Sequence, residues 1–240
     1  MSRSIGIAVP TYNRAAMTLN VFRSVLEDPR VSAVAVSDDD SYLNVYRDLE
    51  AHVGILDKVT LARNDHNLGS WGNKRKAIEL CQAKYVALID SDNVIRQDFV
   101  DALFALSVWH KDVLYAPVSG GPVLDYSKYS GLVVDRQNIK HWLSESLFQM
   151  VLNTGNFFVH RESYLEVSDG PAETSYASDG IYFLYRWLAS GRMLYVTPKL
   201  CYLHLIHHGH WMQTATASMA FANELIRRMQ AGVWETSCTA

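Results

Sequence analysis

Short apolar runs alternate with longer amphipathic stretches through the first half of the chain. The apolar runs predict buried strands, and stretches with apolar positions at helical spacing predict helices between them. Strands are expected at 5–9, 31–37, 58–62 and 85–89, and helices at 16–26, 42–52 and 71–82. Because a repeated strand–helix order favours parallel pairing, this pattern predicts an α/β fold with a mainly parallel sheet covered on both faces.

The second half is less regular. It predicts strands at 113–117, 156–160 and 193–196, and helices at 179–189 and 215–230, around a loop at 119–131 that is rich in Gly, Ser and Tyr. No repeat, low-complexity tract or linker divides the chain. We therefore expect one domain over residues 1–240.

Polar segments follow three of the predicted strands: PTYNR at 10–14, SDDDS at 37–41 and IDSDN at 89–93. In parallel α/β sheets, ligands bind outside the carboxyl ends of the strands, so these segments predict one crevice. Asp90 and Asp92 stand one residue apart there. Like charges so close raise each other's pKa unless a cation lies between them. The pair indicates either a metal site or a polar cap for a helix that begins near Arg96.

Composition excludes several classes. The 240 residues are 49% hydrophobic, enough for a sizeable core, and the net charge of −3 gives no general attraction to nucleic acids or anionic membranes. Three widely separated cysteines, Cys81, Cys201 and Cys238, indicate neither a disulfide scaffold nor a zinc ribbon. We find no signal peptide and no run long enough to cross a membrane. A cytoplasmic protein is the expectation.

Several motifs, in the right order, resemble glycosyltransferases of family 2 with the GT-A nucleotide-sugar fold. They are VPTYNR, VSDDDS, the stretch NLGSWGNKRKAIELCQAKYVALIDSDN and, more sparsely, ASDGIYFLYRWLASG. The resemblance is strongest over roughly residues 5–105. It implies a GT-A-like α/β/α sandwich with a nucleotide-sugar donor half at 1–117. An acceptor half with a C-terminal helix would follow at 118–240.

The resemblance also implies which residues bind the donor, most simply a UDP-sugar. Asp39 would accept a hydrogen bond from the uracil ring. The full set of donor-binding residues is Pro10, Thr11, Tyr12, Asn13, Asp39, Asn67, Gly69, Arg75, Asp90 and Ser91. Asn13 could instead cap the next helix, and the acidic segment could be a solvated turn.

This chain departs from the family pattern near the donor site. Asp40 stands where glycine is common, and larger residues, Trp71 and Asn73, stand where the family has small ones. Arg75 replaces a common asparagine, in a basic cluster at 74–76. Arg75 is our first choice for contact with a diphosphate or an anionic acceptor, and a solvated helix face is the alternative.

A metal site and a catalytic base follow from the same resemblance. Asp92, backed by Asp90, would hold Mn²⁺ or Mg²⁺, with His204 as a further ligand and His207 in reserve. A histidine ligand favours Mn²⁺. Asp179 would act as the general base of an inverting transfer, although Ser178 replaces a glutamate that often precedes it. Capping of the helix at 179–189 is the alternative for this pair.

The acceptor is the least constrained part. The absence of a transmembrane bundle argues against a processive polysaccharide synthase. We expect a saccharide or glycoconjugate acceptor near the loops 119–131 and 153–156, and hydroxylated bases in DNA are the second choice. A nucleotidyltransferase and a catalytically decayed nucleotide-sugar binder are the other functions considered. The former would show a glycine-rich basic loop after the first strand, which VPTYNR is not.

Overall fold

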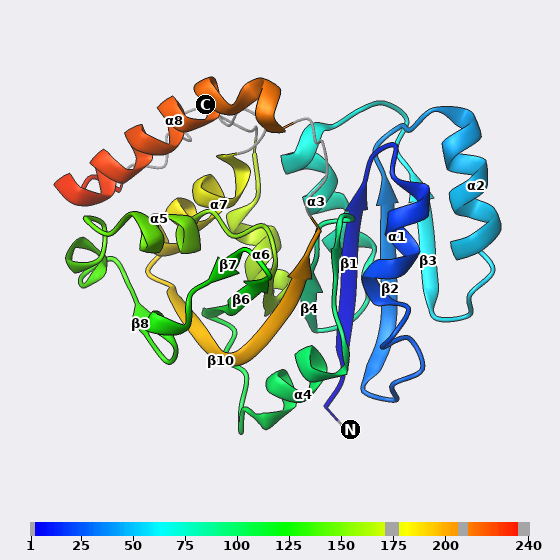
Figure 1. Ribbon diagram of the computed structural model, residues 1–240, viewed down its shortest axis with the longest axis horizontal. Helices are drawn as coiled ribbons and strands as arrows, with labels where there is room; N and C mark the ends of the chain where they lie inside the picture. Colours follow the sequence, from blue (N-terminus) through cyan, green and yellow to red (C-terminus); the bar gives the residue numbers. More distant parts are fainter. Residues whose placement is uncertain (1–2, 171–177, 206–210, 235–240) are drawn as a thin grey trace.

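The computed structural model describes residues 3–170, 178–205 and 211–234 (Figure 1). The predicted donor half contains β1 (Ile5–Thr11), α1 (Ala15–Phe22), β2 (Val31–Asp38), α2 (Leu43–Val53), β3 (Val59–Arg63), α3 (Gly69–Leu80), β4 (Tyr85–Leu88), β5 (Asn93–Val94) and α4 (Gln97–Ala105). The predicted acceptor half contains β6 (Val113–Gly121), β7 (Leu124–Asp125), β8 (Val133–Val134), α5 (Ser146–Leu152), β9 (Phe157–His160), α6 (Arg161–Val167), α7 (Asp179–Ala189), β10 (Met193–His204) and α8 (Trp211–Ala231).

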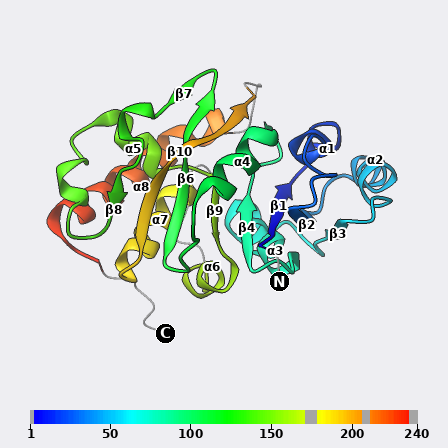
Figure 2. The same ribbon diagram turned by 90° about the horizontal axis from the view of Figure 1, so that it is seen from below.

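One sheet runs through both halves, in the order β3-β2-β1-β4-β9-β6-β10-β5. The first four strands are parallel, as are β6 and β10. The strand β9 runs antiparallel to both β4 and β6, and joins the two parallel parts. The predicted mainly parallel sheet is confirmed, with β4 inside it. Figures 1 and 2 show α1, α2 and β3 toward one end of the molecule, and β8 and α5 toward the other.

Alternating side chains of the central strands build two hydrophobic cores, because successive residues of a strand face opposite sides. In β4, Val86 and Leu88 join the core under α3, α6 and α7, whereas Tyr85 and Ala87 join the core under α1, α2 and α4. Helices therefore cover both faces of the sheet. This arrangement brings the carboxyl ends of β1, β2 and β4 to one open edge.

The acceptor half differs most from the sequence-based expectation. The strand β10 runs on to His204, eight residues past its predicted end, because it keeps pairing with β6 after an irregularity between Thr197 and Cys201. The first residues of the predicted loop 119–131 likewise continue β6, and part of the rest forms β7. The described helices include none long and apolar enough to span a membrane.

Candidate active site

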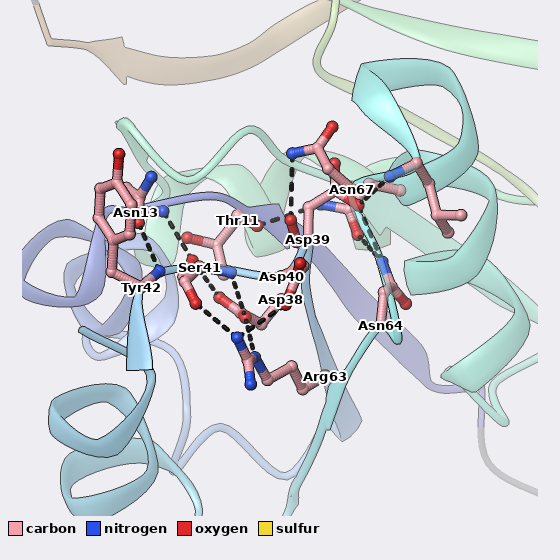
Figure 3. Close-up of polar contacts among 12 residues, drawn as sticks. Thr11, Asn13, Asp38, Asp39, Asp40, Ser41, Tyr42, Arg63, Asn64 and Asn67 are labelled. Atoms are coloured by element: carbon pink, nitrogen blue, oxygen red, sulfur yellow. Dashed lines mark hydrogen bonds and ion pairs between the residues drawn. The ribbon is translucent and has the colours of Figure 1, made fainter. Parts of the chain in front are cut away.

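Two neighbouring loops form one hydrogen-bonded unit at the ends of β1 and β2 (Figure 3). The backbone N–H of Asn13 donates to Ser41 Oγ at 2.7 Å, and Asn13 Oδ1 accepts from the Tyr42 N–H at 2.9 Å. Ser41 Oγ in turn donates to Asp38 Oδ1 at 2.5 Å. The helix-cap interpretation of Asn13 is wrong, because α1 begins after Arg14 and has no side-chain cap. Asn13 instead ties its loop to the acidic segment.

Asp39 lies on the inner side of this unit and is buried. Its Oδ1 accepts from the Leu68 N–H at 2.8 Å and from Asn64 Nδ2 at 3.0 Å. Burial raises the pKa of the Asp39 carboxyl, and these hydrogen bonds oppose the shift. Asn67 donates to the Asp39 carbonyl at 3.1 Å and accepts from the N–H of Gly69, whose φ of +72° is left-handed. Asp38 and Asp39 are therefore buried and held by hydrogen bonds, and the solvated-turn interpretation is wrong for them.

Asp40 adds a negative charge that the structure neutralises. Its φ of +61° is left-handed, which explains why glycine suits this position. Arg63 Nη2 lies 2.7 Å from Asp40 Oδ1, and Arg63 Nε lies 3.7 Å from Asp38 Oδ2. One guanidinium thus balances two carboxylates beside Asp39 (Figure 3).

A buried lysine joins the two halves of the site. Lys74 Nζ lies 3.1 Å from Asp90 Oδ1 and 2.7 Å from Asp179 Oδ2. Burial opposes the charge of Lys74, but attraction to Asp179 and Asp90 outweighs it and raises the lysine's pKa. Burial also raises the pKa of Asp90 to about 6; Lys74 opposes this shift, whereas Asp92 and Asp179 add to it. Two carboxylates and one ammonium are therefore held in a single charged cluster.

The loop at 153–156 positions both carboxylates of this cluster. Asn156 Oδ1 accepts from the Asp90 N–H at 2.8 Å, and Asn153 Oδ1 accepts from the Ile181 N–H at 3.0 Å, in the first turn of α7. A Cβ on Gly155 would lie 2.3 Å from Asp90 Oδ2. A Cβ on Gly180 would lie 2.8 Å from the Asn153 carbonyl oxygen. This loop, predicted as acceptor-binding, thus contacts Asp90 directly and holds the first turn of α7, which carries Asp179.

Neither the Asp90–Asp92 pair nor the Ser178–Asp179 pair caps a helix. The helix α4 begins at Gln97 and has no side-chain cap, so Asp90 and Asp92 do not cap it. The Ser178 side chain makes no capping hydrogen bond to α7, and the Asp179 carboxylate contacts Lys74. Both capping interpretations are therefore wrong.

Asp92 and His204 lie near each other at the same edge. Arg14 Nη1 donates to Asp92 Oδ2 at 2.9 Å. His204 Nδ1 lies 3.0 Å from Oδ1 of Asn93, the residue after Asp92, and the two residues pair across β10 and β5. The part of the chain that the structure describes contains no cluster of three or more His, Cys, Asp or Glu side chains that could hold a metal ion. His207 lies outside the described residues.

The placement of Arg75 corrects the sequence analysis. Its Nη1 donates to the Leu165 carbonyl at 2.7 Å and to Ser168 Oγ at 3.1 Å, and its Nε donates to Glu79 at 2.9 Å. Adjacent residues on a helix point about 100° apart, so Lys74 faces the aspartates while Arg75 faces α6. Lys74, and not the predicted Arg75, is therefore the cation that contacts Asp90 and Asp179.

The other predicted donor residues line the edge in different ways. Pro10, Thr11 and Ser91 are buried, and Thr11 Oγ1 lies 2.8 Å from Thr18 Oγ1. Tyr12 is 43% exposed, so its ring is open to solvent. Asn73 joins the Asp39 segment to β1: it accepts from Asn64 and donates to the Thr11 carbonyl.

Comparisons with known proteins agree with this geometry. The sequence model of Glycosyl transferase family 2 matches residues 6–162. WcaA of Escherichia coli strain K12, named as a colanic acid biosynthesis glycosyl transferase, is 30% identical over 91 residues, which are 37% of this chain and 32% of WcaA. The crystal structure of S. aureus TarS 1–349 with UDP-GlcNAc is similar with a TM-score of 0.68 at 19% identity, covering 95% of this chain and 66% of that one. GalNAc-T7 with UDP, GalNAc and Mn²⁺ has a TM-score of 0.64 at 13% identity, covering 85% and 44%.

The fold and its carboxylate-lined edge define a GT-A protein. The family match spans more than half of the chain, and the chain therefore belongs to Glycosyl transferase family 2. It spans about a third of the length of WcaA.

Proposed function

We propose that the protein transfers a sugar from a nucleoside diphosphate donor, a UDP-sugar, to an acceptor hydroxyl with inversion. The observation that carries this proposal is the Lys74 bridge between Asp90 and Asp179. It joins a carboxylate at the end of a donor strand to a carboxylate at the start of an acceptor helix. A sugar held between the two halves would meet both.

The donor base fits the pocket around Asp39. The carboxylate is buried and fixed by the Leu68 N–H and Asn64, so it presents an oriented acceptor for the uracil N–H. Arg63, the cation beside Asp39, already pairs with Asp38 and Asp40 and leaves the Asp39 carboxylate to the base. Structural similarity to TarS bound to UDP-GlcNAc supports a nucleotide sugar of this class.

The residues present suit a divalent cation. Asp92 offers hard oxygen ligands and His204 an imidazole, and Mn²⁺ and Mg²⁺ take few protein ligands and complete their shell with substrate phosphates. When bound, the cation would neutralise charge on the departing diphosphate. Arg14, which contacts Asp92 from the β1 loop, places a second positive charge at the same spot.

Asp179 is the proposed general base for the acceptor hydroxyl. It begins α7, is mostly buried, and is oriented by Lys74 on one side and by the fixed first turn of α7 on the other. A base needs hydrogen-bond reach of the hydroxyl first, and the protein supplies a defined position for it. We favour a saccharide or glycoconjugate acceptor over hydroxylated DNA, since the net charge is −3.

Two variants test this assignment. Calorimetry with UDP and Mn²⁺ should show binding to the wild type and loss of its Mn²⁺-dependent part in Asp92→Ala. Asp57→Ala, at an exposed site after α2, is the matched control. Asp179→Asn should bind UDP normally but turn over about 10²-fold or more slowly. NMR of the product's anomeric proton should show inversion.

Labelled UDP-sugars offered to oligosaccharides and to hydroxymethylated duplex DNA identify the acceptor class. Transfer only to the duplex would overturn the saccharide assignment. UDP binding without hydrolysis or transfer in any of these assays would indicate a decayed binding domain instead. Normal turnover of Asp179→Asn would remove that residue from the role of base.

A further inference from the structure

Arg186, in the last turn of α7, is a buried cation with no anionic partner among the residues that the structure describes. It is only 9% exposed, and it has no ion pair or hydrogen bond with any residue that the structure describes. Its contacts are aromatic: Cζ lies 5.7 Å from the ring centroid of Trp71 and 5.8 Å from that of Tyr182. A guanidinium stays protonated in proteins, and burying an unpaired charge is costly.

The basic side chains closer to the donor pocket are all paired. Lys74 contacts Asp90 and Asp179, Arg14 contacts Asp92, and Arg63 contacts two aspartates. Arg186 differs from all of them because aromatic rings shield it on two sides and no described carboxylate pairs with it. This difference indicates a counter-ion supplied by a ligand.

Trp71 provides a second unused donor at the same place. It is 7% exposed, and its Nε1 is buried without a hydrogen-bond partner in the described parts of the chain. A buried indole N–H usually finds an acceptor. The ring packs on Tyr182 at 4.9 Å and lies beneath Arg186, so side chains from α3 and α7 meet here.

The cluster lies beside the proposed catalytic groups. Trp71 precedes Lys74 by one turn of α3, and Arg186 follows Asp179 by two turns of α7. Seven residues of a helix rise about 10 Å. A ligand whose hydroxyl is at Asp179 would therefore reach Arg186 with a group one or two sugar units away.

We infer that Arg186 and the Trp71 indole N–H form a subsite for an anionic oxygen group, a phosphate or a carboxylate, carried by the acceptor. Arginine suits this role because its planar fork binds phosphate and carboxylate with two parallel hydrogen bonds. The assignment of this anionic group to an acceptor substrate rests on the proposed glycosyl transfer. The anion subsite itself does not depend on turnover.

The first test uses inorganic phosphate on the full chain, without donor. In ¹⁵N-tryptophan-labelled protein, the Trp71 indole signal, assigned by its loss in Trp71→Phe, should shift saturably with phosphate at constant ionic strength. Phosphate should also raise the thermal unfolding midpoint, since a ligand of the native state stabilises it. We expect Arg186→Met to weaken phosphate binding at least 10-fold and Trp71→Phe to weaken it less.

Arg192→Met is the matched control. Arg192 also stacks on a tryptophan, 5.1 Å from the Trp187 centroid, but Glu166 and Asp112 already pair with it. Its loss should leave the phosphate response unchanged. An equal response to phosphate in the wild type and in both Arg186→Met and Trp71→Phe would overturn the subsite, as would a Trp71 signal that does not move.

Titration with glucose 6-phosphate, glucuronate and glucose separates the sources of the anion. The subsite predicts that one or both charged sugars move the Trp71 signal and that neutral glucose does not. If glucose acts as strongly as the charged sugars, the inference is wrong. Failure of sugar transfer with a normal phosphate response would count against the proposed function alone.

Discussion

The hydrogen bonds around Asp39 join residues nearer in sequence than do the contacts between the two halves of the chain. Asp39 and Asn64, which hydrogen-bond to each other, are 25 residues apart. Asn93 and His204, which meet where the halves join, are 111 residues apart. Local contacts form with a small loss of chain entropy, and distant ones require the whole sheet to be in place. We therefore expect changes at the junction of the two halves, around Lys74 and Asp179, to disturb folding and catalysis together. Changes around Asp39 should mainly weaken donor binding.

The largest effect is expected at Lys74. Lys74→Met would leave the buried Asp179 and the partly exposed Asp90 without their shared cation. Breaking a fully buried ion pair costs about 3–5 kcal/mol, which is the upper limit here. Urea unfolding should show this loss of stability, and turnover should fall with it. Lys76, two residues on, is half-exposed and, among the described residues, pairs with Glu79 alone, so Lys76→Met should cost less than about 1 kcal/mol. Equal losses in the two variants would contradict the bridge.

Gly180→Ala should act on the same junction through the backbone. Its Cβ would lie 2.8 and 2.9 Å from the carbonyl oxygens of Asn153 and Thr154, so α7 must shift. We expect about 1–3 kcal/mol of destabilisation. Turnover should fall up to about 10²-fold, because a small displacement of a catalytic group is costly. Gly121→Ala, where a Cβ meets nothing within 4 Å, is the control.

Asp39→Asn should weaken donor binding with little effect on folding. The amide oxygen can still accept from the Leu68 N–H, so the fold should be nearly unchanged. A hydrogen bond to a charged group contributes about 1.5–3 kcal/mol, so UDP should bind roughly 10- to 100-fold more weakly by calorimetry. Turnover at saturating donor should change far less than in Asp179→Asn. A large loss of stability would show that Asp39 is mainly structural.

The same difference explains what could be predicted from the sequence. The strands and helices of the donor half follow from local periodicity, and the strand ends place PTYNR, SDDDS and IDSDN at one edge. The helix α7 is found at its predicted residues, 179–189, because its apolar positions are regular. Local patterns thus suffice wherever an element's own side chains determine its place.

Residues whose role depends on tertiary contact were missed or misjudged. Nothing in NKRK distinguishes Lys74 from Arg75, because the choice depends on which of them faces α7 and which faces α6. Asn156 and Gly155 gain their importance from Asp90, which lies in a different half. The extension of β10 likewise depends on pairing with β6. Glycines and asparagines in a short loop between a helix and a strand are the one signal that pointed there.

The smallest effect is expected from a local ion pair of the donor half. Arg30 hydrogen-bonds to the carboxylate of Asp28 and, together with Gln97, holds the pKa of Asp28 well below its usual range, against the opposing effect of burial. Because the folded-state pKa is lowered, this contribution to stability is present above the unfolded pKa, about 3.9. It is lost as pH falls below that value.

Asp28→Asn should therefore be less stable than the wild type by about 1 kcal/mol or less at pH 7. In urea unfolding measured from pH 7 to pH 2.5, the gap between the two proteins should hold to about pH 4 and then narrow. Asp57→Asn, at an exposed position in the α2–β3 loop, should track the wild type throughout. A gap that widens in acid would mean that Asp28 is protonated more easily in the folded protein, and that Arg30 does not hold it.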